Sequence, residues 1–244
     1  MLLERKMALL AAALALLAGC ARKKEEAAYL QTGFVMSTQA HVKVYGAPPE
    51  EGKRIADAVF AEWKRVDDEY SFGSPYGSVA HVNGKAYGEW VRVDDEFLAL
   101  LAKSMEYFRL TDGAFDITFA PLWPIWKEAA SSRKMPPKEE IARALSSMGS
   151  RHIMVDHPRK LVRFLKPVQI NMGGVLRGYC MERGRLALER TAGAYPVELK
   201  LGGNILAYGK RDWSYSAPDP FHEGGSLGSF RFDEGFIMYS SGRD

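Results

Sequence analysis

The chain has 244 residues, of which 47% are hydrophobic and 26% are charged, so it is long enough to bury the core of one globular domain and does not have the composition of a disordered chain. Its 33 basic and 30 acidic residues leave a net charge of +3, which argues against a nucleic-acid-binding protein with a strongly basic surface. An anionic ligand must therefore be bound by a local arrangement of residues.

The start of the chain has the pattern of a bacterial export signal. Basic residues precede an apolar run, Met7 to Ala18, which is shorter than a comfortable membrane-spanning helix. The run ends in Leu17-Ala18-Gly19-Cys20, which resembles the lipobox of exported lipoproteins. We expect residues 1–19 to be a signal peptide, Cys20 to be lipidated, and residues 20–29 to be a tether that holds the exported domain at a bacterial membrane. A chance cysteine after a signal-like segment is the alternative.

A strand and a helix are predicted next. Residues 41–45 alternate polar and apolar side chains, which is typical of a half-buried strand. Apolar residues then recur at steps of four, four and three, so that they share one face of a helix. These residues are Ile55, Val59, Trp63 and Val66. Residues 71–83 are rich in Ser and Gly, which predicts an ordered loop.

The middle of the chain is predicted to mix helices with short strands. A strand over 89–93 leads to Asp94-Asp95, acidic residues that are suited to cap a helix. The apolar face of that helix consists of Phe97, Leu101, Met105 and Phe108. Residues 138–148 predict a second amphipathic helix, and residues 152–156 are expected to pair with 160–165 as a hairpin.

The most informative segment joins a predicted strand, residues 168–171, to a helix through Gly173 and Gly174. Glycines at such a junction let a ligand approach the backbone, and the N–H groups of the first helical turn favour an anion. Arg177 and Arg183 can add charge-assisted hydrogen bonds to a phosphate. A tight turn before a solvated basic helix is the alternative interpretation. The residues expected to face inward are Val175, Tyr179, Leu186 and Ala187.

Short strands are expected after Pro196, so the chain is α+β without internal repeats. Four glycine-punctuated segments occur in an order that resembles the ApbE family of FAD:protein FMN transferases. They are residues 33–38, 113–126, 171–180 and 201–205, followed by Asp219-Pro220 and Ser240-Ser241-Gly242. The resemblance covers about residues 30–244. It implies a mixed fold of two α/β halves with the ligand cleft between them.

The resemblance assigns ten residues to the FAD site. They are Met36, Ala114, Phe115, Asp116, Gly173, Gly174, Arg177, Arg183, Gly203 and Asn204. Cys180 falls where the family binds magnesium through a backbone carbonyl, so its thiol is expected to be an unreactive hydrophobic group. Taken singly, Met36 and Phe115 could instead fill the core, and Asp116 could cap a turn.

The implied reaction moves FMN from FAD to a Thr or Ser hydroxyl of an acceptor flavoprotein, with magnesium as cofactor and AMP as leaving group. The expected partners are FAD, the acceptor and, through the lipid, a membrane; no nucleic acid is expected. A non-catalytic lipoprotein that binds flavin is the main alternative, and a structural lipoprotein is a third.

The sequence also departs from the family pattern. Asn171 replaces an aspartate, Arg177 a lysine and Glu182 another aspartate. The sequence ends at Asp244, before the family's C-terminal segment, which supplies a histidine and further magnesium ligands. Because oxygen ligands hold magnesium, we expect this 244-residue form to bind flavin weakly and to transfer little.

Overall fold

The computed structural model describes residues 27–240. The predicted signal peptide, the predicted lipidation site Cys20 and all but the end of the predicted tether lie outside the described residues, as do Ser241 and Gly242. No helix within residues 27–240 is long and apolar enough to cross a membrane.

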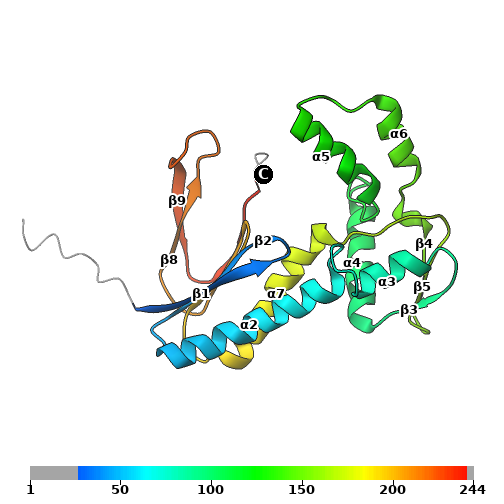
Figure 1. The fold of residues 1–244 in the computed structure, drawn as a ribbon. Coiled ribbons are helices and arrows are strands. Elements are labelled where there is room, and N and C mark those ends of the chain that lie inside the picture. The colour runs from blue at the N-terminus through cyan, green and yellow to red at the C-terminus, as the bar shows by residue number, and fades with distance from the viewer. Residues whose placement is uncertain (1–26, 241–244) are drawn as a thin grey trace, which may run out of the picture.

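One half of the protein is a five-stranded sheet in which every neighbouring pair is antiparallel (Figure 1). Its strands, in spatial order, are β1 (Ala28–Val35), β2 (Thr38–Tyr45), β6 (Val197–Leu201), β7 (Asn204–Tyr208) and β10 (Gly235–Met238). Side chains alternate between the two faces of a strand. Ala40, Val42 and Val44 of β2 are almost fully buried on one face, whereas the intervening His41 and Lys43 point to the other face and are partly buried. The predicted strand at 41–45 is therefore confirmed, with three more residues at its start.

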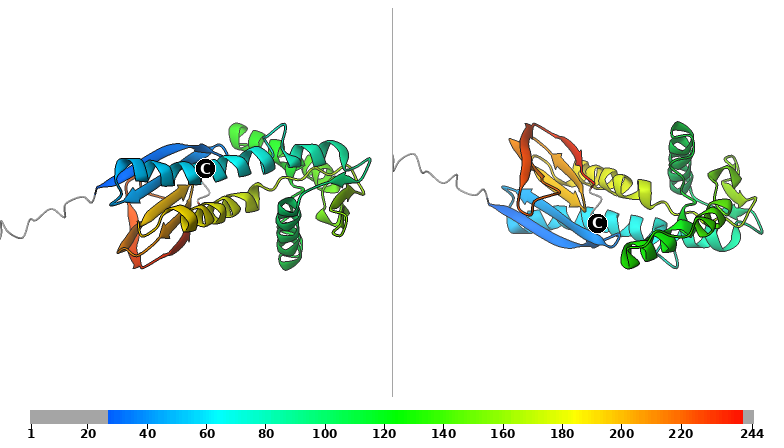
Figure 2. Two further views of the ribbon diagram at one scale, coloured as in Figure 1. Left: turned by 90° about the horizontal axis from the view of Figure 1, so that it is seen from below. Right: turned by 90° about the horizontal axis from the view of Figure 1, so that it is seen from above.

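Two long helices, α2 (Pro49–Tyr70) and α7 (Gly173–Thr191), pack side by side on one face of this sheet (Figures 1 and 2). The predicted apolar face of α2 is confirmed, because all four of its predicted residues are fully buried. Gly184 allows the close approach of α7: a Cβ atom there would lie 2.8 Å from Leu199 and 2.9 Å from the indole of Trp63. A larger residue would push the two helices apart.

The other half carries short helices around a three-stranded antiparallel sheet, β3-β5-β4 (Figure 1). Its elements are α3 (Ser78–Lys85), β3 (Val91–Arg92), α4 (Asp95–Leu110), η1 (Ala120–Leu122), α5 (Trp123–Ser132), α6 (Lys138–Ser146), η2 (Ser150–His152), β4 (Ile153–Asp156) and β5 (Leu161–Phe164). The capping prediction is confirmed, since the Asp94 carboxylate accepts a hydrogen bond from the Phe97 N–H at 2.6 Å. The predicted 138–148 helix and the 152–165 hairpin are also confirmed.

A two-stranded ribbon, β8 (Trp213–Pro218) and β9 (Ser226–Phe232), rises from the sheet face opposite the helices (Figure 1). Aromatic rings join it to the sheet, with Trp213 edge-on to Tyr45 and Tyr215 stacked between Trp213 and Phe232. The mixture of helices and antiparallel sheets confirms the predicted α+β class.

Two local predictions are wrong. The stretch 71–83 is not a loop throughout, because α3 begins at Ser78 and buries Val79 and Val82. Residues 168–171 form no strand, because the backbone N–H and carbonyl of Ile170 are paired with the side-chain amide of Asn83 at 2.8 and 2.9 Å. A side chain here replaces a neighbouring strand as the partner of the extended backbone.

The inward face of α7 differs from the prediction by about one position. Of the four residues predicted to face inward, Ala187 is buried, whereas Val175, Tyr179 and Leu186 are only partly buried. The buried residues are Leu176, Cys180, Met181, Gly184, Ala187 and Leu188. The reason is that α7 packs against both α2 and the sheet, so its buried surface is centred between the two. As a result, the Tyr179 hydroxyl reaches Glu96 of α4.

Candidate functional site

A cavity of about 820 Å³ lies between α4, the start of α7 and the β7–β10 edge of the sheet. Its volume falls within the roughly 300–1,000 Å³ of typical ligand clefts. Five aromatic residues contribute to its wall: Tyr107, Phe115, Tyr179, Phe236 and Tyr239. Because the wall is drawn from both halves of the fold, the cavity occupies the position expected for the cleft between the halves.

The start of α7 forms one side of this cavity through Gly173 and Gly174. The N-cap residue Met172 makes no side-chain cap, but the Asn171 side chain accepts a hydrogen bond from the Gly173 N–H at 2.9 Å. Gly174 must be small, because a Cβ atom there would lie 2.8 Å from the ring of Phe115. Arg177 in the same wall brings a positive charge to the cavity, and Lys103 on α4 brings a second one that is paired with Glu106 at 2.9 Å. The helix dipole and these charges together favour an anion.

The turn between β6 and β7 closes another side. Gly203 lies in close contact with the segment after β10: a Cβ atom there would lie 2.2 Å from the carbonyl oxygen of Tyr239. The Tyr239 N–H donates to the Gly203 carbonyl at 3.0 Å, and Asn204 donates to the Leu201 carbonyl at 3.1 Å. Gly203 therefore allows the chain after β10 to reach the cavity wall.

A second cavity of about 1190 Å³ adjoins the first. The two share Arg177, Gly203, Tyr239 and Ser240. The second cavity is lined by more polar side chains, among them those of His41 and Lys200. Arg177 thus stands where an aromatic cavity meets a polar one.

Six of the ten residues predicted to bind FAD lie together in the wall of the first cavity. They are Phe115, Gly173, Gly174, Arg177, Gly203 and Asn204. The other four, Met36, Ala114, Asp116 and Arg183, are absent from the lining of either cavity. For these four the structure shows other contacts or an exposed position.

Asp116 serves as the cap of a turn, which is the alternative that the sequence left open. Its carboxylate accepts hydrogen bonds from the backbone and hydroxyl of Thr118 at 2.8 and 2.7 Å, and from the hydroxyl and backbone of Ser150 at 2.6 and 3.1 Å. These bonds join the loop before η1 to η2. Ala114, two residues earlier, is exposed.

Met36 lies in the tight turn between β1 and β2, with a positive φ of 51°. Its backbone N–H donates to Asp67 at 2.7 Å, and its sulfur lies 3.9 Å from the Cys180 sulfur. Cys180 is fully buried, and this burial raises the pKa of its thiol, so it behaves as the expected inert hydrophobic group. The Cys180 carbonyl, predicted to be a magnesium ligand, accepts a hydrogen bond from the Trp63 indole at 2.8 Å.

Arg183 faces α2, where it binds Glu62 at 3.1 and 3.2 Å. It belongs to a polar network that the sequence analysis did not identify. Arg65 lies on α2 and contacts both Glu62 and Glu96, and Glu96 accepts a hydrogen bond from the hydroxyl of Tyr179. The spacing of Glu62 and Arg65 predicts only a local helix pair, so the long-range partners had no sequence signal.

The network fixes the charge states of its members. Burial raises the pKa of Glu96, but hydrogen bonds from Arg65, Tyr179 and Tyr70 outweigh burial and lower it to about 2. Burial and the neighbouring Glu96 raise the pKa of Tyr179 to about 12. Glu96 is therefore an anion and Tyr179 a neutral donor at every physiological pH.

Metal binding has little support from the side chains present. Within residues 27–240, no three or more His, Cys, Asp or Glu side chains are grouped as a metal site. Of the predicted magnesium ligands, this part of the chain contains only the Cys180 carbonyl, which is already a hydrogen-bond acceptor. We therefore assign no chemical step to a metal.

A family model described as the ApbE family matches residues 36–244. The chain is 22% identical over 200 residues to an FAD:protein FMN transferase of Klebsiella pneumoniae, covering 82% of this chain and 61% of the relative. It is 25% identical over 226 residues to one of Haemophilus influenzae, covering 87% and 64%. The chain spans less than two thirds of the length of either relative.

Solved structures show the same fold. An ApbE protein from Thermotoga maritima superimposes with a TM-score of 0.75 at 25% identity, covering 86% of this chain and 69% of the other. The apo form of the flavinyl transferase ApbE of Pseudomonas stutzeri gives a TM-score of 0.63 at 21% identity, with coverages of 79% and 62%. Both likenesses span the two halves between which the first cavity lies.

Proposed function

Because the chain belongs to the ApbE family, we propose that it is an FAD:protein FMN transferase whose FAD site is the first cavity. One observation carries this proposal: the wall of an aromatic cavity contains Arg177 and the first turn of α7. FAD combines planar ring systems with a pyrophosphate. The cavity offers a surface suited to each of them.

The residues of the cavity have distinct proposed roles. Phe115, Tyr107 and Tyr179 provide flat apolar surfaces for a ring system. Gly173 and Gly174 let the pyrophosphate approach the backbone at the start of α7, and Arg177 adds charge-assisted hydrogen bonds. Holding the phosphates in this way lowers the barrier to transfer mainly through positioning and electrostatics.

The proposed reaction is a phosphoryl-type transfer. The oxygen of an acceptor Thr or Ser hydroxyl attacks the phosphorus of the FMN half of FAD and releases its proton to water, while the bond from that phosphorus to the AMP oxygen breaks and its electron pair stays on AMP. AMP then leaves. Arg177 borders both cavities, so a phosphate held there could be reached from the polar second cavity, which is the proposed side of approach for the acceptor flavoprotein.

Magnesium stays a prediction of the family resemblance: it would neutralise pyrophosphate charge when bound, but the side chains within residues 27–240 form no group that would hold it. The Cys180 carbonyl remains the predicted ligand. The location of the protein in the cell is also a proposal. The lipobox-like Leu17-Ala18-Gly19-Cys20 supports an exported protein anchored to a bacterial membrane through a lipid on Cys20.

Two measurements test the proposal with the chain as it is. Titration of FAD, followed by flavin fluorescence, should show saturable binding that FMN alone reproduces only weakly, because FMN lacks the second phosphate and the adenosine. Incubation with FAD, magnesium and an acceptor flavoprotein should then release AMP and raise the mass of a small fraction of the acceptor by one FMN, because the described residues group no side chains for magnesium. Binding without AMP release would favour the non-catalytic flavin-binding lipoprotein. Absence of saturable binding would refute the FAD site.

A further inference from the structure

We propose that Arg65, Glu96 and Tyr179 form a clamp that sets the width of the first cavity by holding the Tyr179 ring in its wall. Tyr179 is then a positioning residue for the ligand, and Glu96 acts through it. The identity of the ligand as FAD rests on the function proposed above. The geometry of the clamp does not depend on that identity.

The first step of the argument is that the two long walls of the cavity belong to different helices. Leu100, Lys103 and Tyr107 come from α4, whereas Arg177 and Tyr179 come from α7. These helices belong to different halves of the fold (Figure 1). The distance between the walls therefore depends on whatever joins α4 to α7.

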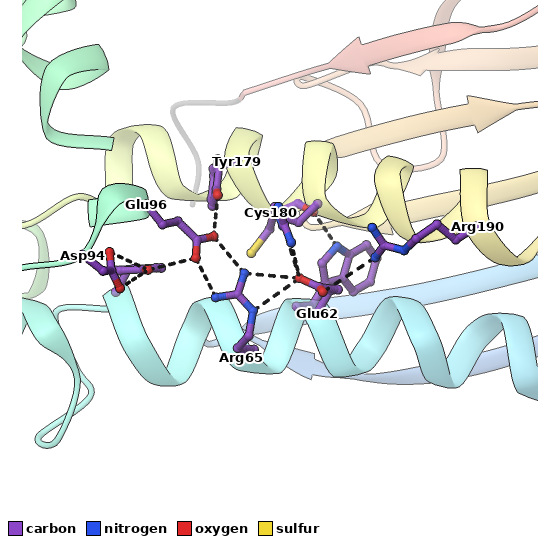
Figure 3. A network of polar contacts seen from close by, with 10 residues as sticks. Glu62, Arg65, Asp94, Glu96, Tyr179, Cys180 and Arg190 are labelled. Atoms are coloured by element: carbon purple, nitrogen blue, oxygen red, sulfur yellow. Dashed lines mark hydrogen bonds and ion pairs between the residues drawn. The ribbon is translucent and has the colours of Figure 1, made fainter. Parts of the chain in front are cut away.

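The second step is the bond that joins them. The Tyr179 hydroxyl donates to Glu96 Oε1, and Glu96 lies in the first turn of α4 (Figure 3). Tyr179 thus serves two purposes, since its ring lines the cavity and its hydroxyl crosses to the other helix. Tyr179 is also packed against the hydrophobic core, so this bond adds a second restraint, at the hydroxyl end of the ring. The neighbouring Gly178 gives no lateral support, because even a Cβ atom there would contact nothing within 4 Å.

The third step is that Glu96 is itself immobilised. Arg65 of α2 donates to both carboxylate oxygens, each at 2.8 Å, and the Tyr70 hydroxyl donates at 3.0 Å. A two-pronged arginine–carboxylate pair fixes orientation as well as distance. Only a quarter of the Glu96 side chain is exposed, so solvent weakens the pair less than it would on an open surface.

Charge state strengthens this interpretation. Because the pKa of Glu96 is about 2 and that of Tyr179 about 12, the donor and acceptor keep their roles throughout the range between those values. The clamp is therefore permanently engaged and does not respond to physiological pH. A fixed cavity wall avoids the cost of ordering a side chain when the ligand binds.

The chain offers a matched pair of variants for the test. Tyr179→Phe and Tyr70→Phe each remove one hydroxyl that donates to Glu96, but only Tyr179 lines the cavity. In FAD titrations we expect Tyr179→Phe to raise Kd about tenfold, equal to about 1.4 kcal/mol. Tyr70→Phe should leave Kd within about twofold while lowering stability to urea. Equal effects of the two variants on Kd, or an unchanged Kd for Tyr179→Phe, would overturn the proposal.

A ligand-free measurement separates this proposal from the FAD assignment. Hydrogen exchange of the backbone amides at the start of α7, in the absence of FAD, should be faster in Tyr179→Phe and unchanged in Tyr70→Phe. If the unmodified chain failed to bind FAD, the proposed function would fall, and the exchange data would still decide the clamp. Unchanged amide exchange at the start of α7 in Tyr179→Phe would refute the clamp.

Discussion

The start and the middle of α7 place similar arginines in different surroundings. Arg177 is exposed in the wall of the cavity, whereas Arg183, about two turns later, binds Glu62 of α2. Residues six positions apart point roughly 120° away from each other around a helix axis, so they do not share one face of the helix. The difference teaches that a basic residue near a glycine-rich helix start contributes to an anion site only if the helix turns it toward open space.

The largest effect is expected from filling the start of α7. Gly174→Ala should lower stability by about 2 kcal/mol and weaken FAD binding, because the new Cβ would lie 2.8 Å from the Phe115 ring. Urea unfolding and FAD titration would measure the two losses. Gly178→Ala is the control for stability, since its Cβ meets nothing within 4 Å and alanine favours a helix. Equal destabilisation by both variants would show that close packing at Gly174 is not the cause.

A somewhat smaller loss of stability is expected at acidic pH. It should arise from protonation of Glu96 on α4, which accepts a hydrogen bond from Tyr179 of α7. Folding lowers the pKa of Glu96 from 4.5 to about 2, so its stabilisation is present above about pH 4.5 and is lost as the pH falls toward 2. The shift sets an upper limit of about 3 kcal/mol, and partial exposure reduces the expected contribution to about 1.5 kcal/mol. Urea unfolding between pH 5 and pH 2.5 would measure it.

Glu96→Gln provides the comparison for that experiment, because it keeps the size of the side chain and removes its charge. The variant should lose less stability between pH 5 and pH 2.5 than the unmodified chain, by the contribution of Glu96. Parallel pH profiles for the two proteins would contradict the shifted pKa.

The smallest effects separate the two arginines directly. Arg177→Gln should raise Kd for FAD about fivefold, roughly 1 kcal/mol, with little change in stability. Arg183→Gln should leave Kd unchanged and lower stability by about 0.5–1 kcal/mol, because Glu62 keeps Arg65 as a partner. Titration and urea unfolding on both variants would check the contrast. A loss of affinity in Arg183→Gln would restore the role that the sequence predicted for it.

Much of the fold could be predicted because local patterns carry it. The apolar face of α2, the Asp94 cap and the β4–β5 hairpin each follow from spacing or capping chemistry within a few residues. The errors arose where a distant group replaced a local one. Asn83 satisfies the backbone of Ile170, and the buried positions of α3 could not be distinguished from a polar loop by composition.

The candidate site was predicted best where backbone geometry limits the residue type. A side chain at Gly174 would collide with Phe115, and one at Gly203 would collide with the Tyr239 carbonyl. Glycine at these positions therefore indicates that another part of the chain lies close to the backbone. Asp116 and Met36 are absent from the linings of both cavities, so their roles in binding FAD stay predictions. The Asp116 carboxylate accepts hydrogen bonds from Thr118 and Ser150.

By itself the sequence determined the α+β class, most of the helices and strands, and the glycine-rich start of α7, because these depend on periodicity and on the conformational freedom of single residues. Only the tertiary structure decided which side of α7 faces the cavity and which faces α2. It also decided that Arg65, Glu96 and Tyr179 meet. These three residues lie on three helices that are far apart in the chain, and their contact depends on how the helices pack.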